Sequence, residues 1–163
     1  MQNTIKISPL TAAAFAPFGD ILCKTQAPSA YHINQGNCLR HHDLAKIEAT
    51  GTNARVLINI FSAKPYSLPL LLNMVERHPY GSQAFMPLSP EPFLVIVAHD
   101  TGEGPARPQA FITQSGQGVN IHRNVWHGVL TPLNKPCDFL VVDRGGDENN
   151  LQEFFFPTPY LVE

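Results

Sequence analysis

The sequence predicts an all-β protein, an antiparallel sandwich or barrel, on three observations. Strand-length apolar runs recur along the chain and are bounded by Pro, Gly or Asp. Almost no helical pattern lies between them, which disfavours βαβ units. Turn formers are frequent, with 15 Pro and 11 Gly in 163 residues, and 44% of the chain is hydrophobic. This length is typical of one domain, so we expect residues 1–163 to form a single domain.

The N-terminal part predicts short elements joined by turns. Residues 5–7 are expected to form a short strand. Thr11 is a suitable N-cap for a brief helix through the alanines that follow, and Pro17 ends that helix. Residues 20–23 predict another short strand. The polar loop expected after it carries the turn formers Asn34, Gly36 and Asn37.

The strand pattern is clearer from residue 54 onward, whereas the segment 39–47 before it fits a strand or a helix equally. The C-terminal segment 154–161 is aromatic and proline-rich, so either the core or a partner chain must cover it. A symmetric dimer is one such cover. The expected strands are 55–61, 70–78, 93–99, 110–113, 129–130 and 138–142.

Charge and cysteine content exclude several classes of function. The formal net charge is −2 and no run of Lys or Arg occurs, so we expect neither a nucleic acid nor a membrane as partner. Cys23, Cys38 and Cys137 are an odd number without CxxC spacing, which disfavours a disulfide framework and a zinc knuckle and favours a reducing compartment. No apolar segment has the length of a signal peptide or a membrane span. We therefore expect a soluble, cytoplasmic protein.

Two polar stretches of the sequence predict one shared pocket. Glu76 and His78 are two residues apart, so on a strand both side chains point to the same face. If the chain turns at Gly81 and returns, Gln83 faces back toward them. His127 comes about forty residues later, on a strand expected after a turn. These four side chains are the candidate ligands and catalytic groups.

Their spacing resembles the two motifs of the cupins. Cupins typically read His-x-His-x4-Glu and then Pro-x-Gly-x2-His, whereas this chain reads Glu76-x-His78-x4-Gln83 and then His122-x-Asn124-x2-His127. The spacing agrees, and the carboxylate has moved from the third position to the first. The resemblance implies a jelly-roll barrel with one or two short helices and a metal site. A set of two imidazoles and two oxygens suits Ni²⁺, Mn²⁺, Fe²⁺ or Zn²⁺ without choosing among them.

Seven short strings, in order along nearly the whole chain, resemble the ureidoglycolate lyase family more specifically. This resemblance implies a homodimeric cupin of allantoin degradation that splits ureidoglycolate, a small anion, into glyoxylate and urea. The strings are Tyr31-His32-Ile33-Asn34, His42-Asp43-Leu44, Glu76-Arg77-His78-Pro79, Gln83-Ala84-Phe85, Gln117-Gly118-Val119-Asn120, His122-Arg123-Asn124-Val125-Trp126-His127 and Asp143-Arg144-Gly145-Gly146.

The reaction needs a base for the hydroxyl proton and an acid for the departing urea nitrogen. Glu76, His78 and His127 are the expected catalytic groups. If a metal is bound, it chelates the hydroxyl and carboxylate oxygens and lowers the hydroxyl pKa. Without a metal, Glu76 or His127 is the base directly.

The anionic substrate predicts an arginine that contacts its carboxylate through two parallel hydrogen bonds. Arg144 is the first candidate, since it precedes two glycines at an expected rim loop, and Arg123 is a second. Gln83 is expected either to contact the substrate or to support the turn. His32 and Asn34 are expected on an early loop that closes over the pocket of the same or the partner subunit.

Alternatives stay open at this stage. His78 and His127 can instead be hydrogen-bonded structural histidines near the barrel mouth. The enzyme can act on another small hydroxy acid as a metal-dependent cupin, which a requirement for oxygen would indicate. A non-catalytic cupin that binds a small anion is the third possibility, because a fold alone does not assign an activity.

Overall fold

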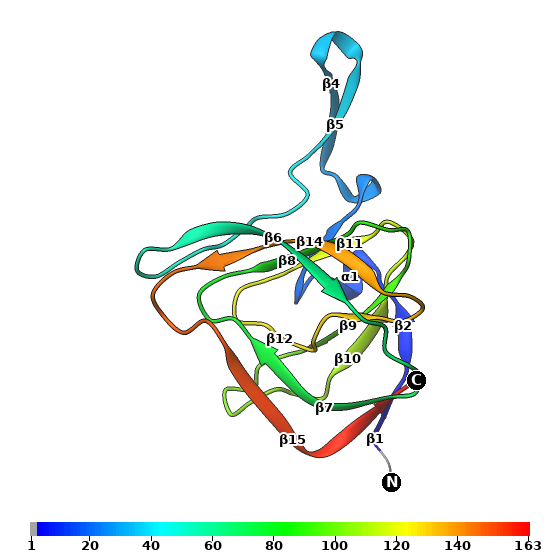
Figure 1. Ribbon diagram of the computed structural model, residues 1–163, viewed down its shortest axis with the longest axis vertical. Helices are drawn as coiled ribbons and strands as arrows, with labels where there is room; N and C mark the ends of the chain where they lie inside the picture. The colour runs from blue at the N-terminus through cyan, green and yellow to red at the C-terminus, as the bar shows by residue number, and fades with distance from the viewer. Residues whose placement is uncertain (1–2) are drawn as a thin grey trace.

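The computed structural model describes residues 3–163, and the two larger of its three β-sheets pack face to face as a nearly closed barrel (Figure 1). This architecture confirms the predicted all-β, cupin-like class. One sheet has five strands in the order β3 (Gly19–Leu22), β11 (Gly118–Ile121), β8 (Gln83–Pro87), β14 (Cys137–Gly145) and β6 (Arg55–Ala63). The other has eight, β1 (Asn3–Ile5), β15 (Gln152–Val162), β7 (Leu70–Arg77), β12 (Trp126–His127), β9 (Phe93–Ala98), β10 (Gln109–Ile112) and β2 (Ile7–Pro9) in order, with β13 (Thr131–Pro132) paired to β9.

The main core fills the space between the two sheets. Phe139 of β14 packs edge-on against Phe93 of β9, with ring centroids 5.0 Å apart. Strand β9 is buried on both faces, which explains its unbroken apolar sequence. Its alternate residues Leu94, Ile96 and Ala98 belong to a second core cluster on the other face of the sheet. Phe154, Phe156 and Tyr160 of β15 pack against that second cluster, so the core covers part of the C-terminal segment.

The N-terminal segment differs from the sequence expectation at one point. The predicted strand 5–7 is wrong, because the chain changes partner at Lys6: β1 pairs with β15 and β2 pairs with β10. The brief helix is confirmed as α1 (Ala12–Phe15), and the Thr11 hydroxyl accepts a hydrogen bond from the Ala14 N–H at 3.3 Å. Strand β3 follows it, close to where the sequence predicts a strand.

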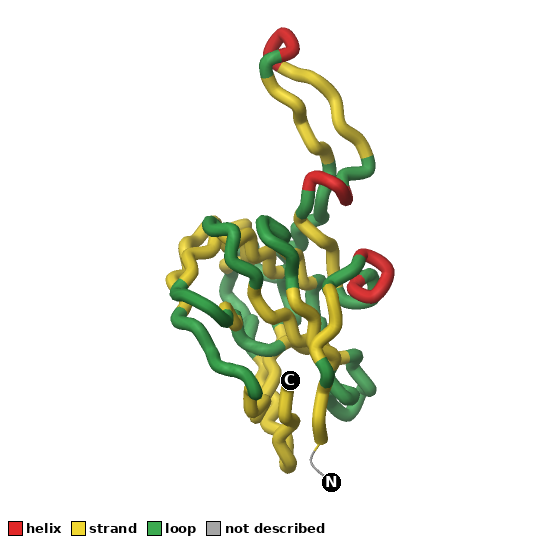
Figure 2. The backbone as a smooth tube through the Cα atoms, turned by 90° about the vertical axis from the view of Figure 1, so that its right-hand side faces the viewer, coloured by secondary structure: helices red, strands yellow, loops and turns green. Residues whose placement is uncertain are grey.

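A hairpin arm, β4 (Ser29–Ile33) and β5 (Cys38–His42), stands away from the barrel (Figures 1 and 2). The 3₁₀ turn η1 (Lys24–Gln26) leads into it, and η2 (Asn34–Gly36) forms its tip. The predicted turn at Asn34 is confirmed, since Asn34, Gln35 and Gly36 all have positive φ. The expectation of a loop before this turn is wrong, because residues 29–33 pair with 38–42. The ambiguous segment 39–47 therefore begins as a strand.

Two other segments differ from regular strands. The strand predicted at 129–130 is wrong, since these residues connect β12 to β13 outside both strands. Strand β15 has a register shift between Phe155 and Tyr160, where Pro157 and Pro159 lack the N–H that a ladder requires. Among the described residues, no helix is long and apolar enough to cross a membrane.

Candidate functional site

The pairing of β7 with β12 brings the two predicted motifs together. His127 lies directly opposite Glu76 in the antiparallel register, so their side chains share one face. His78 follows the end of β7, and Gln83 begins β8 after the intervening turn. A second turn positions His127: Asn124 has φ of +67°, and its N–H donates to the carbonyl of His78 at 2.9 Å.

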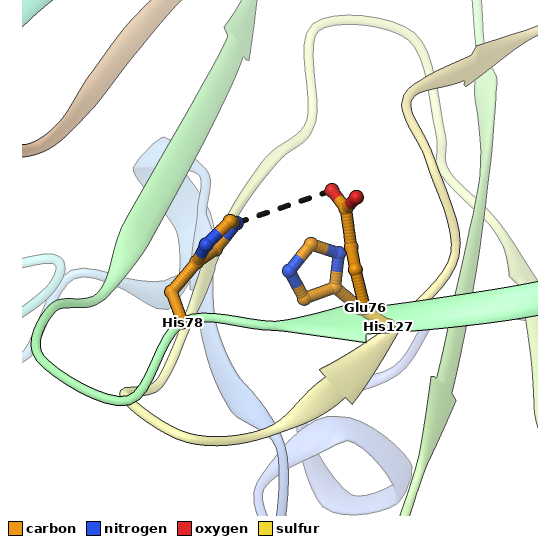
Figure 3. Close-up of side chains that lie close together, drawn as sticks. All are labelled: Glu76, His78 and His127. Atoms are coloured by element: carbon orange, nitrogen blue, oxygen red, sulfur yellow. Dashed lines mark ion pairs between the residues drawn. The ribbon is translucent and has the colours of Figure 1, made fainter. Parts of the chain in front are cut away.

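Glu76, His78 and His127 form a cluster, called here the triad, in which one ligand atom of each lies within 4.8 Å of the others. Figure 3 shows the carboxylate and both rings turned toward a common space. The Glu76 Oε1 is 4.0 Å from His78 Nε2, and the two ring centroids are 5.1 Å apart. Gln83 joins them, since its Oε1 lies 3.2 Å from His78 Nε2. The structure thus brings together all four predicted ligands.

The hydrogen bonds of the two histidines fix which nitrogen faces this space. His78 Nδ1 lies 2.7 Å from the carbonyl of Asn150, and His127 Nδ1 lies 2.9 Å from the carbonyl of Gly128. A carbonyl only accepts hydrogen bonds, so each Nδ1 carries the proton and donates it. The Nε2 of His127 is then left with a lone pair directed at the triad. His78 Nε2 also faces an acceptor, the Oε1 of Gln83 at 3.2 Å, but the shorter contact to Asn150 places the ring proton on Nδ1. Nε2 keeps its lone pair when the Gln83 amide turns its NH₂ group toward it. The His127 Nε2 is buried and has no hydrogen-bond partner within residues 3–163.

Burial shifts the ionisation of the triad. The His127 pKa falls from 6.5 to about 4, first because burial disfavours the imidazolium and second because His78 is close. The Glu76 pKa is raised, mainly by burial and also by Glu153, while His78 partly opposes that rise. His127 is therefore neutral near pH 7, and Glu76 is a stronger base than an ordinary surface carboxylate.

A cavity of about 250 Å³ adjoins the triad at His78 and Gln83. Asp143 extends into its wall from β14, and its Oδ1 accepts a hydrogen bond from Asn59 Nδ2 at 2.9 Å. The sequence did not single out Asp143 as a site residue, and Ser82 and Asn150 gave no signal at all. The complete lining is His78, Ser82, Gln83, Asp143, Arg144, Asn150 and Leu151.

Arg144 lines the same cavity, but its guanidinium is bonded to protein atoms. It donates to the Thr50 carbonyl at 3.0 Å, to the Glu148 carbonyl at 3.1 Å and to the Glu148 carboxylate. Only 1% of the Arg144 side chain is exposed. A substrate carboxylate would therefore meet little of this guanidinium.

The other predicted substrate contacts lie farther from the triad or at its rim. Arg123 is partly exposed and donates to the Pro79 carbonyl at 3.1 Å, next to His78 in the chain. His32 is on β4 and Asn34 is at the tip of the hairpin arm, which points away from the barrel of its own chain (Figure 1). Within one chain, the structure does not bring these two residues to the triad.

The chain is similar to known proteins along nearly its entire length. A family model described as "Ureidoglycolate lyase" matches residues 2–163. A ureidoglycolate lyase of Mesorhizobium japonicum is 62% identical over 99% of this chain and 98% of its own. Another, of a Chelativorans species, is 60% identical over 99% of this chain and 97% of its own, and ureidoglycolate lyase 2 of Rhizobium meliloti is 54% identical over 98% and 97%. The chain therefore belongs to the ureidoglycolate lyase family.

Proposed function

We propose that this protein is an enzyme that cleaves ureidoglycolate into glyoxylate and urea. The observation that carries the proposal is the triad beside a polar cavity in a chain whose whole length matches the ureidoglycolate lyase family. Neither of the other candidate functions, a different hydroxy-acid enzyme or a non-catalytic anion-binding cupin, has a specific observation in its favour. The reaction breaks the carbinol carbon–nitrogen bond and turns the carbinol into an aldehyde. The hydroxyl loses one proton and the urea nitrogen gains one, so no water is consumed.

In the metal-free site, Glu76 is the proposed base for the hydroxyl proton. Its raised pKa favours uptake of a proton near neutral pH, and its carboxylate is directed into the common space of the triad. The proton that Glu76 receives is then available for the departing nitrogen. Asp143 is the proposed acceptor for the ureido N–H groups, because its carboxylate lies in the cavity wall and Asn59 fixes its orientation.

The triad and Gln83 also fit a divalent metal ion. Two imidazole lone pairs, a carboxylate and an amide oxygen converge, and the buried Nε2 of His127 has no other partner within the described chain. Glu76, His78, His127 and Gln83 are the proposed ligands. A bound Ni²⁺, Mn²⁺, Fe²⁺ or Zn²⁺ would hold the hydroxyl and carboxylate oxygens of the substrate and stabilise the developing carbonyl. Such an ion would take the role for which the sequence favoured an arginine.

A homodimer in the cytoplasm, acting in allantoin degradation, completes the proposal. Val56, Ile58 and Ile60 form an exposed apolar row on the outer face of β6, at the open edge of the five-stranded sheet. Ile58 alone is 74% exposed, which favours burial against a second copy. Three free cysteines are consistent with a reducing compartment. The pathway rests on the family resemblance.

Product analysis tests the proposed reaction. Purified protein is incubated with ureidoglycolate, and urea, glyoxylate and ammonia are quantified. We expect equal amounts of urea and glyoxylate and no enzyme-dependent ammonia. Ammonia released in place of urea would identify a hydrolase of the ureido group, and no turnover at all would favour a non-catalytic binding protein.

A further inference from the structure

Arg144 joins two loops, residues 48–52 and 146–150, and stacks on a third; the second loop reaches the cavity at Asn150. Its Nε donates to Thr50 in the first loop, while Nη1 and Nη2 donate to the backbone and the carboxylate of Glu148 in the second. Its guanidinium carbon lies 5.3 Å from the ring centroid of Tyr80 in the third, the turn between β7 and β8. One nearly buried side chain thus connects three loops, two of which carry residues that line the cavity.

The chain leaves space for this guanidinium through three glycines. A Cβ at Gly146 would lie 2.2 Å from Arg144 Nη2, and one at Gly51 would lie 2.8 Å from the same atom. A Cβ at Gly81 would lie 2.4 Å from the Arg144 Cβ. Gly51 also has φ of +93°, which side-chain-bearing residues rarely adopt. Because the surrounding backbone comes this close to the Arg144 side chain, the side chain is restricted to one conformation.

The loop held by Arg144 reaches the triad two residues farther on. The carbonyl of Asn150 accepts the Nδ1 proton of His78 at 2.7 Å. The side-chain oxygen of Asn150 accepts the Tyr80 N–H at 2.8 Å, which ties the same loop to the turn after His78. Glu148 adds a further bond, since its Oε1 accepts the Thr52 N–H at 2.7 Å. That N–H is the main cause lowering the Glu148 pKa to about 2, so the carboxylate stays ionised opposite Arg144.

We propose that Arg144 is a positioning residue: it holds residues 146–150 so that the Asn150 carbonyl keeps His78 in the Nδ1–H tautomer, with Nε2 directed at Glu76 and Gln83. In this role Arg144 acts through Asn150 and His78 and does not contact the substrate carboxylate. Partners that orient a ligating histidine typically change metal affinity about 10- to 100-fold when they are lost. The proposal rests on the proposed function only in treating the triad as the reactive site.

The test reads the tautomer of His78 directly in Arg144→Gln. Long-range ¹H–¹⁵N correlation spectra of metal-free protein labelled at histidine nitrogen distinguish the two tautomers. We expect wild type to show only the Nδ1–H form at His78 and Arg144→Gln to show a mixture. We also expect the Mn²⁺ affinity of Arg144→Gln to fall at least about 10-fold and kcat to fall more than KM rises. A variant that keeps the tautomer and the Mn²⁺ affinity but raises KM would show direct substrate binding and overturn the proposal.

Two further variants keep the test decisive. Glu148→Gln removes the ion-pair partner of Arg144 at a partly exposed position, so it serves as the test if Arg144→Gln does not fold. We expect it to give a smaller fraction of the other His78 tautomer and a smaller loss of Mn²⁺ affinity than Arg144→Gln. An unaltered tautomer and Mn²⁺ affinity would overturn the proposal. Arg107→Gln is the matched control, because Arg107 also donates to a backbone carbonyl, that of Thr4, and lies over a tyrosine ring, that of Tyr160. It should leave His78 unchanged. The tautomer is measured without substrate, so a failure of wild type to release urea would refute the proposed function separately.

Discussion

At the scale of single residues, the proposed chemistry depends first on a histidine that is kept neutral, His127. His127 is 2% exposed, and within residues 3–163 its Nδ1 donates to the carbonyl of Gly128 while its Nε2 has no hydrogen-bond partner. Protonation would therefore place a charge in the interior without a hydrogen bond to Nε2. The depressed pKa leaves its Nε2 lone pair available over the whole neutral range. The same burial should make the free energy of unfolding depend on pH.

Stability should therefore fall with acidification in a way that depends on His127. The unfolded chain binds a proton at this residue below about pH 6.5, whereas the folded chain does so only near pH 4. The contribution of His127 to the free energy of unfolding is fully present above pH 6.5. It is lost as the pH falls toward 4, by about 1.4 kcal/mol per pH unit. Urea unfolding of metal-free wild type and His127→Gln between pH 7 and 4 measures this difference. If the free energies of unfolding of the two proteins changed equally with pH, the lowered pKa would not belong to His127.

Gln83 replaces the glutamate that the first cupin motif usually carries at this position, so its substitution should tune metal affinity. Gln83→Glu restores a carboxylate 3.2 Å from His78 Nε2 and should bind Mn²⁺ at least about 10-fold more tightly, whereas Gln83→Leu should bind it more weakly. Titration calorimetry on chelator-treated protein gives both values. Gln109→Glu, an exposed change on β10, is the control. Equal affinities for all the variants would remove Gln83 from the ligand set.

Residue spacing predicted the triad because strand alternation and hairpin return are local rules. Glu76 and His78 had to share a face, and the turn at Gly81 returned Gln83 to them. Asn150 could not be found in this way, since it acts through its backbone carbonyl, which every residue possesses. Arg144 was expected at the cavity, but which atoms its guanidinium would bond depended on loops that have no pattern in the sequence.

At the scale of elements, β6 has a half-buried inner face and an exposed apolar outer face. Its inner residue Asn59 supports Asp143, while Val56, Ile58 and Ile60 on the other face are 53%, 74% and 58% exposed. One strand thus connects the cavity wall to the proposed dimer surface. The hairpin arm also has exposed apolar side chains at Tyr31 and Leu39, and isolated two-stranded hairpins are only marginally stable in water.

Ile58→Glu should dissociate the proposed homodimer. Burying this carboxylate against a second copy would cost more than the apolar contact it replaces contributes. Light scattering after size-exclusion chromatography should give a dimer for wild type and a monomer for the variant at micromolar concentration. Phe155→Glu, an exposed aromatic on β15 of the other sheet, is the matched control and should remain dimeric. A dimeric Ile58→Glu would place the interface elsewhere.

The sequence predicted the central strands well and the connections poorly. Strands β6, β7, β9 and β14 are apolar runs of strand length, so the local sequence alone predicts them. The first strand of the arm was expected as a polar loop and the second was left open between strand and helix, because the two strands pair only with each other. The break at Lys6 depends on two partners far away in the chain, β15 and β10, which no local pattern specifies.

At the scale of the whole molecule, the barrel brings residues of distant segments into one reactive space. β7, β12 and the turn after β7 supply the triad and β8 supplies Gln83, while β14 supplies Asp143 and Arg144 to the adjoining cavity. The second core cluster supports β12 from behind through Trp126, whose Nε1 donates to Asp100 at 3.2 Å. The two-residue strand that carries His127 is thereby held rigidly between β7 and β9.

The rate of urea release by Glu76→Gln tests the central claim most directly. The amide keeps the size of the side chain but cannot accept the hydroxyl proton, so we expect urea release at least about 10²-fold slower than in wild type. Glu153→Gln, which changes the carboxylate opposite Glu76 in the neighbouring strand, should stay within a few-fold of wild type. A folded Glu76→Gln that releases urea at the wild-type rate would contradict the account.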